Sequence, residues 1–261
     1  MTMILKGIKT KVVEVGDDLV EVILDGIRRA RIKLRDHDIL VITSKVVSVS
    51  EGRIVSLKEV KPSEKAVKLS EQCGLPPEFV EVVLKEADEV YGCVYGALLT
   101  LRKGVLQANA GVDRSNAPPG YVILPPKDPT ESARKIRKKV IEKTGKKVAV
   151  LIVDSRVQPL RLGNTGIALG VAGFEPVIDE RGKSDIYGER LKITRRAIAD
   201  CIAAAAEIIM GERNEKTPVV LVRNAPVVFT ERLVDDLEMT IPIEECMYMG
   251  VFMKFVKGYK V

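Results

Sequence analysis

The chain has 261 residues, of which 46% are hydrophobic, and a formal net charge of +6. This composition argues against wholesale disorder and allows a sizeable core, while the positive charge favours an anionic partner. Tryptophan is absent and only 4% of the residues are aromatic, so a base-stacking surface for nucleic acid is poorly supported. A small phosphorylated ligand accounts for the charge equally well.

The four cysteines, Cys73, Cys93, Cys201 and Cys246, lie far apart and predict reduced, mostly buried thiols of a cytoplasmic protein. His37 lies in a polar turn and is interpreted as a solvated residue rather than a catalytic base. Zinc sites and serine–histidine hydrolysis are therefore poorly supported, and any metal is expected to be hard and oxygen-bound. No signal peptide or long apolar span is present, so we expect neither export nor membrane insertion.

The first elements alternate between strand and helix. Residues 3–15 predict an early strand, and an apolar stripe over 19–29 predicts a helix. Residues 39–43 predict a buried strand that runs directly into Ser44 and Lys45. A lysine in that position is either a surface residue with a buried stem or a ligand for phosphate.

Two helices and a hairpin are predicted next. Ser63 caps the first helix, which runs to Cys73, and Pro77 opens the second. The segments 98–102 and 105–107 predict a hairpin joined by a short turn.

The loop from Ala108 to Asn116 places small residues around Asp113. It suits either a ligand-lining loop or a plain Asx-rich turn. Asp128 and Pro129 then have the cap and first-turn character of a helix that extends to Thr144. The basic residues of this helix fall mainly opposite its apolar stripe, which favours a solvated face over a nucleic-acid patch.

Residues 148–154 form a continuous apolar run that ends in a carboxylate, which predicts a strand covered on both faces. Asp154 and Ser155 emerge at its end, where open sheets tend to bind ligands. A loop over 158–166 follows, in which Arg161 can bind an anion bidentately. The alternative is a buried strand with an ordinary turn.

The last third predicts a helix from Thr194 to Met210 and a buried strand over 219–222. The helix contains the run Ala203 to Ala206, which permits close packing, including packing against another subunit. Between this helix and the central strand, residues 174–188 are polar and rich in turns.

Asp113 and Asp154 are the strongest chemical signal. Each ends an apolar segment, and a serine follows close behind. Converging aspartates would form a site for Mg²⁺ or Mn²⁺ on phosphate groups. Neither a P-loop nor a dinucleotide-binding fingerprint accompanies them.

Segments that span most of the chain together resemble the coenzyme F420-0 gamma-glutamyl ligase family. The segments are Gly16-Asp17-Asp18, Ser48, Glu51-Gly52-Arg53, Ala108 to Asn116, Asp154-Ser155, Pro159, Arg161, Gly163, Thr165, Gly170 to Gly173, Asp179, Arg181-Gly182, Asp185, Gly188 and Met210-Gly211. Their order and spacing, rather than any one of them, make the resemblance specific.

The resemblance implies an archaeal-like, GTP-dependent amide ligase that uses Mg²⁺ or Mn²⁺, with K⁺ as a further candidate ion. It implies one α+β domain over residues 1–261, with mixed and antiparallel sheets and packed helices, assembled as an intertwined homodimer. The expected substrates are F420-0 or an analogue and L-glutamate, joined through an acyl phosphate. Neither nucleic acid nor membrane is an expected partner.

The resemblance also assigns residues. The metal ligands would be Asp113, Asp154, Ser155 and Glu212. The nucleotide contacts would be Thr10, Lys11, Val12, Val13, Ser44, Lys45, Asn116, Met210, Gly211 and Arg213. The catalytic residues would be Asp113, Asp154 and Arg161.

Two departures from the family pattern leave alternatives open. Val49 stands where the family usually has a second lysine, and the loop over 155–166 lacks an aromatic and a carboxylate that are usual there. A related ligase with a different acid and amine would account for the loop. A nucleotide-binding dimer without catalysis would account for Val49.

Overall fold

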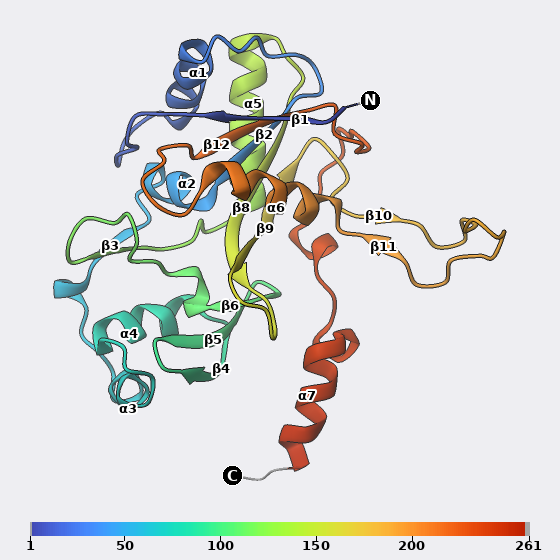
Figure 1. Ribbon diagram of the computed structural model, residues 1–261. Helices are drawn as coiled ribbons and strands as arrows, with labels where there is room; N and C mark the ends of the chain where they lie inside the picture. Colours follow the sequence, from blue (N-terminus) through green and yellow to red (C-terminus); the bar gives the residue numbers. More distant parts are fainter. Residues whose placement is uncertain (1, 259–261) are drawn as a thin grey trace.

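The computed structural model describes residues 2–258, and its largest sheet has five strands in the order β1–β12–β2–β8–β9 (Figure 1). The strands are β1 (Ile4–Ile8), β12 (Val219–Arg223), β2 (Ile39–Thr43), β8 (Ala149–Val157) and β9 (Asn164–Ala172). Strands β2 and β8 are parallel, and the other neighbours are antiparallel. The sheet is therefore mixed, as the resemblance implies.

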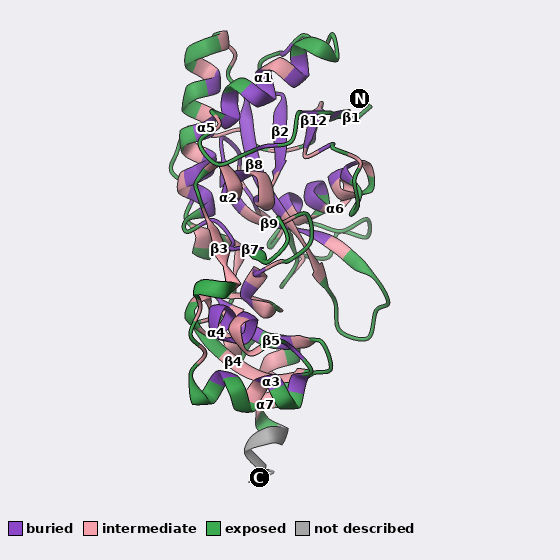
Figure 2. Cartoon of the chain, turned by 90° about the vertical axis from the view of Figure 1, so that its left-hand side faces the viewer, coloured by how far each residue is buried: buried purple, intermediate pink, exposed green. Residues whose placement is uncertain are grey.

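Helices cover both faces of this sheet, so its central strands are buried (Figure 2). On one face, α1 (Leu19–Arg29) and α5 (Pro129–Thr144) share a core with β2 and β8. On the other face, α6 (Ile198–Met210) shares a second core with the same strands. Burial on both faces explains why residues 148–153 are uniformly apolar.

A smaller layer has its own core. It contains a three-stranded antiparallel sheet and two helices, namely β4 (Glu89–Val94), β5 (Ala97–Arg102), β6 (Val105–Ala108), α3 (Glu64–Cys73) and α4 (Pro77–Glu86). The short strands β3 (Ile54–Ser56) and β7 (Tyr121–Ile123) pair antiparallel on the way into and out of this layer. The α+β class with mixed and antiparallel sheets is thus confirmed.

Two further segments project from the body of the molecule (Figure 1). One is the arm that contains β10 (Ile178–Asp179) and β11 (Arg195–Arg196), and the other ends in α7 (Met247–Gly258). Short 3-10 helices, η1 (Leu57–Glu59), η2 (Asn109–Gly111), η3 (Asp236–Met239) and η4 (Ile243–Glu245), complete the elements. In the described part of the chain, no helix has the length and apolarity needed to cross a membrane.

Local capping signals confirm several predicted helix boundaries. The side chain of Ser63 accepts a hydrogen bond from the amide of Ala66, as an N-cap does. Pro77 opens α4, and Gly145 ends α5 in the left-handed conformation. These boundaries depend on neighbouring residues only, which is why the sequence predicts them.

Three predicted elements are wrong in extent. The early strand is only β1, because residues 9–18 leave the sheet before α1 begins. The last long helix begins at Ile198 rather than Thr194, because Arg195 and Arg196 pair with β10. The loop after β8 ends at Asn164, where β9 begins as the antiparallel partner of β8. Pairing between distant segments decided each case.

The prediction of four reduced, mostly buried thiols is wrong. Cys73 and Cys93 form a disulfide, because the end of α3 and strand β4 bring their Cα atoms to 5.7 Å. Cys201 and Cys246 are free, and Cys201 is exposed on α6. The 20-residue separation of the bonded pair gave no sequence signal for this contact. The prediction that His37 is an exposed turn residue is confirmed.

The N-cap of α5 gives a stability prediction. The Asp128 carboxylate accepts a hydrogen bond from the Glu131 amide at 2.8 Å. Asp128→Ala should lower the free energy of unfolding by about 1 kcal/mol and the melting temperature by about 2–4 °C. Asp128→Asn is the matched control because Asn also caps, so a similar loss in both variants would contradict this role.

Candidate functional site

A cavity of about 310 Å³ lies beyond the end of β2 and beside residues 153–155 of β8, which continues to Val157. Because these strands are parallel, with Thr43 opposite Val153, the residues that follow them meet at one edge of the sheet. Ser44 and Lys45 begin helix α2 (Ser44–Ser50), and Asp154 and Ser155 continue β8. The sequence therefore directs polar groups from two separate segments into the same space.

The cavity gathers nearly all the predicted site residues. It is lined by Thr10, Lys11, Val12, Val13, Ser44, Lys45, Asp113, Asn116, Asp154, Ser155, Met210, Gly211, Glu212 and Arg213. Val49, at the position where the family usually has lysine, lines it as well. These residues come from parts of the chain as far apart as Thr10 and Arg213, and only the folded structure joins them.

Lys45 and Asp113 form a compact polar cluster with Ser115. The Lys45 ammonium lies 2.6 Å from Asp113 Oδ2 and donates a hydrogen bond to Ser115 Oγ at 2.7 Å. The Ser115 hydroxyl in turn donates to Asp113 Oδ2 at 2.7 Å. Burial alone would raise the pKa of Asp113, but the Lys45 ammonium and the Ser115 hydrogen bonds hold it below its ordinary value.

The backbone holds Asp113 in place. Its amide and carbonyl exchange hydrogen bonds with Ile123 at 3.0 and 2.8 Å, so the loop extends the β3–β7 pair. Just before it, Asn109 and Ala110 adopt positive φ values of 53° and 52°. This conformation is uncommon for residues other than glycine and often marks a functional loop. The ligand-lining interpretation of residues 108–116 agrees with this geometry.

Asp154 has the opposite electrostatic environment to Asp113. Burial, together with the negative charge of Asp113, raises its pKa to about 6. The Ser155 amide, which donates to Asp154 Oδ1 at 2.9 Å, offsets this only in part, as do Ser44 and the Lys45 charge. No arginine is among the groups acting on it, so neither Arg156 nor Arg161 neutralises this carboxylate within the described residues.

Glu207, which the sequence analysis missed, faces the same cavity from helix α6. Burial, together with the neighbouring Glu212 carboxylate, raises its pKa to about 7. Its Oε1 atom is buried and has no hydrogen-bond partner among the described residues. A signal did exist, because Glu207 is the one charged residue between Cys201 and Met210 in the apolar stretch of α6.

The loop after α6 closes the cavity. The Asn116 side-chain amide donates to the carbonyl of Arg213 at 3.2 Å, and the Thr10 amide donates to that of Lys216 at 3.1 Å. Gly211 ends α6 with φ of 70°, and an added Cβ would meet the Glu215 side chain. The close approach of three segments leaves backbone groups and the Arg213 side chain near the cavity.

Arg161 is the predicted site residue that this cavity does not include. It lies on the exposed turn between β8 and β9, where its amide donates to the carbonyl of Gln158 at 3.2 Å. The side chain therefore faces solvent within a single chain.

The donor set fits a hard divalent cation. Among residues 2–258, no three carboxylate, imidazole or thiol side chains converge into a ready-made metal cluster. However, Asp154 and Glu207 form no ion pair with the described residues and have raised pKa values, and Glu207 has a buried oxygen without a partner among them. Oxygen donors of this kind suit Mg²⁺ or Mn²⁺.

Comparison with known proteins agrees with this geometry. The family model described as F420-0:gamma-glutamyl ligase matches residues 7–224. The coenzyme F420:L-glutamate ligase of Methanopyrus kandleri is 44% identical over 209 residues, covering 80% of this chain and 81% of that protein. The Methanothermobacter thermautotrophicus protein of the same name is 41% identical over 212 residues, covering 81% and 84%. This chain belongs to the F420-0:gamma-glutamyl ligase family.

Proposed function

We propose that this ligase joins L-glutamate to the carboxylate of F420-0, using GTP and a divalent metal. The observation that carries the proposal is the Lys45–Asp113–Asp154 arrangement at the ends of two parallel strands. A lysine that shares a cavity with an unpaired carboxylate, here Asp154, is suited to phosphate and its counter-ion. The names of the relatives supply the substrates, and their similarity covers about four-fifths of the chain.

The proposed reaction has two steps. A carboxylate oxygen of F420-0 bonds to the γ-phosphorus while the bond to the bridging oxygen breaks, which releases GDP. The glutamate amine then attacks the acyl carbon, loses a proton, and displaces phosphate. Lys45 orients the phosphates as a point charge, and the amides of the 210–217 loop contact the nucleotide.

Asp113, Asp154, Ser155 and Glu212 would hold the metal, and Glu207 adds a further carboxylate beside them. When bound, the metal neutralises charge on the transferred phosphoryl group. K⁺ is a further candidate ion. Arg161 is assigned to the anionic substrates. Because its side chain faces solvent in a single chain, this role requires the turn between β8 and β9 to lie against a substrate-binding cavity.

The test is a complete reaction with purified full-length chain, GTP, Mn²⁺, F420-0 and L-glutamate. We expect GDP, phosphate, and an F420 product heavier by one glutamyl residue, detected by mass spectrometry. Omitting F420-0 should abolish GDP formation, and replacing GTP by ATP should lower the rate. GTP hydrolysis without a glutamylated product would contradict the proposal.

We also propose that the chain functions as an intertwined homodimer. Large apolar side chains are strongly exposed in a single copy, on the β8–β9 turn (Leu160, Leu162), the β10–β11 arm (Ile186, Tyr187) and α6 (Ile208). Exposed apolar groups of this number favour a protein interface. Within the run Ala203 to Ala206, Ala203 and Ala206 are buried in the core with β9, where a Cβ at Gly166 would meet the Ala203 carbonyl.

The dimer gives a prediction. Because intertwined copies share one core, dissociation should coincide with unfolding. Sedimentation at micromolar concentration should show only dimer, and the melting temperature should rise with protein concentration. A folded, monodisperse monomer would contradict the proposal, and it would leave the Arg161 turn without a cavity to contact.

A further inference from the structure

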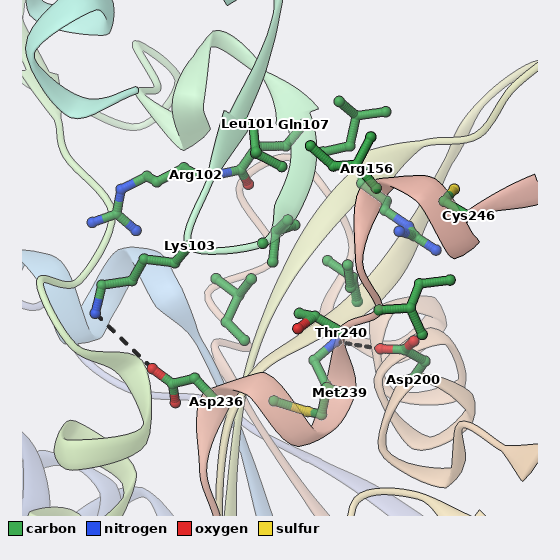
Figure 3. Close-up of a pocket in the computed structure, with 18 of the residues that line it drawn as sticks. Leu101, Arg102, Lys103, Gln107, Arg156, Asp200, Asp236, Met239, Thr240 and Cys246 are labelled. Carbon is green, nitrogen blue, oxygen red and sulfur yellow. Dashed lines mark hydrogen bonds and ion pairs between the residues drawn. The ribbon is translucent and has the colours of Figure 1, made fainter. Parts of the chain in front are cut away.

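A second cavity, of about 220 Å³, lies beyond the outer edge of β9. Its walls are the β5–β6 hairpin, the β8–β9 strands, the first turn of α6, and residues 236–249 (Figure 3). It shares no lining residue with the first cavity, which is lined by Lys45 and Asp154 and is proposed to bind the nucleotide. Its volume is below the range of drug-sized ligand sites, so it suits a small molecule.

Three buried polar atoms of residues in this cavity wall have no hydrogen-bond partner among residues 2–258. They are Nε of Arg156, Oδ1 of Asp236 and the hydroxyl oxygen of Tyr91. Leaving such groups unsatisfied costs on the order of 1–3 kcal/mol each, and more when the group is charged. A ligand or water molecules that form these hydrogen bonds would remove that cost, so the wall is suited to a polar occupant.

The wall carries charges of both signs, of which Lys103 and Asp236 pair with each other. Within the described chain, the Arg156 guanidinium has no ion pair. Asp200 uses one carboxylate oxygen to accept a hydrogen bond from the Ala168 amide at 2.9 Å, and it forms no ion pair with another described residue. Figure 3 shows both side chains on one side of the cavity, with Lys103 and Asp236, 4.0 Å apart, on the other.

A cation and an anion that lie on the same side of a cavity without pairing with each other are complementary to a zwitterion. An α-amino acid carries a carboxylate for Arg156 and an ammonium for Asp200, each in a charge-assisted hydrogen bond. Lys103 adds a second positive charge, which suits a second carboxylate. The remaining wall is largely aliphatic, including Leu101, Ile167 and Met239, and would cover the methylene groups of such a ligand.

The cavity adjoins the nucleotide site. Arg156 is two residues beyond Asp154 on β8, which corresponds to about 7 Å and to the same face of the strand. Asp200 precedes Glu207 by seven residues on α6, or about 10 Å along the helix. A ligand bound between Arg156 and Asp200 is therefore close to the site of phosphoryl transfer.

We propose that this second cavity binds the incoming amino acid, L-glutamate, with Arg156 on a carboxylate and Asp200 on the ammonium group. The inference rests on the proposed ligase function and extends it, because it locates the amine substrate apart from the nucleotide. Both residues are binding residues and neither takes part in phosphoryl transfer.

The test compares Arg156→Gln and Asp200→Asn with wild type in steady-state kinetics. Each variant should raise the KM for L-glutamate at least tenfold and leave the KM for GTP within twofold. Asn at position 200 keeps an acceptor for the Ala168 amide, so a folding defect is not expected there. Arg29→Gln, a charge removal on the far surface of α1, is the matched control and should change neither KM.

Failure of the inference is distinguishable from failure of the proposed function. If wild type makes the glutamylated product and both variants keep the wild-type KM for glutamate, the cavity is not the glutamate site. If wild type makes no product, calorimetric titration of L-glutamate into the full-length protein tests whether the second cavity binds this amino acid. Binding that is lost in Arg156→Gln and kept in Arg29→Gln supports the site, and absence of wild-type binding overturns it.

Discussion

Asp154→Asn should lower turnover at least a hundredfold, which corresponds to about 3 kcal/mol of transition-state stabilisation. Asn keeps the shape of the side chain but removes the charge that a divalent cation needs. The affinity for Mn²⁺ should fall in parallel, and calorimetric titration of Mn²⁺ into the protein measures it. Asp25→Asn, an exposed carboxylate on α1 that pairs with Arg29, is the control and should leave both quantities unchanged.

The same substitution should stabilise the metal-free protein at neutral pH. The folded-state pKa of Asp154, about 6, lies above its ordinary value of 3.8. Protonation therefore favours the folded state, so this stability contribution is complete below about pH 4 and is lost as the pH rises through about 6. At pH 7, the Asn variant avoids the cost of a charged carboxylate in the folded state, which raises the free energy of unfolding by at most about 3 kcal/mol.

Chemical denaturation without metal, at pH 4.5 and at pH 7.5, measures this effect. Wild type should lose stability between the two values, and Asp154→Asn should lose less. Glu207, whose pKa is raised to about 7, contributes a remaining loss in the same direction. A variant less stable than wild type at pH 7.5, with unchanged Mn²⁺ affinity, would show that Asp154 is a structural carboxylate.

Lys45→Ala should weaken GTP binding about 10- to 100-fold, because it removes a charge-assisted contact to phosphate. The melting temperature should change little. The side chains of Lys45 and Asp113 are 28% and 43% exposed, and ion pairs with this exposure contribute less than about 1 kcal/mol. Fluorescent nucleotide titration and thermal denaturation measure the two effects.

Lys143→Ala is the matched control for Lys45→Ala. Lys143 also forms an exposed ion pair, with Glu21 at 2.5 Å, but it lies on α5 away from the cavity. The control should bind GTP as wild type does. A large loss of stability in Lys45→Ala with full nucleotide affinity would mean that this lysine is structural.

Two candidate-site features could be predicted from the sequence because each depends on its own segment. An apolar run that ends at Asp154 predicts a polar group beside a ligand site, although β8 itself continues to Val157, and Lys45 directly follows a second such run. The resemblance to a known family then connected these segments. The cavity contains all the metal and nucleotide residues that it assigned, and of the assigned catalytic residues it lacks only Arg161.

Other features could not be predicted because they arise from contacts between distant residues. The raised pKa of Asp154 requires burial beside Asp113, which is 41 positions earlier. In the sequence, Glu207 is only a charged residue in an apolar helix. The packing of α6 on β9 is what places it at the cavity. The second cavity exists only because residues 236–249 return to the edge of that strand.

The sequence by itself determined the helix boundaries at Ser63, Pro77 and Gly145 and the buried character of β2 and β8, because caps and hydrophobic runs are local properties. The tertiary structure decided which strands pair, that Cys73 bonds to Cys93, and which carboxylates share a cavity. Those outcomes depend on the packing of segments far apart in the chain, where burial and charge act through space rather than along the sequence.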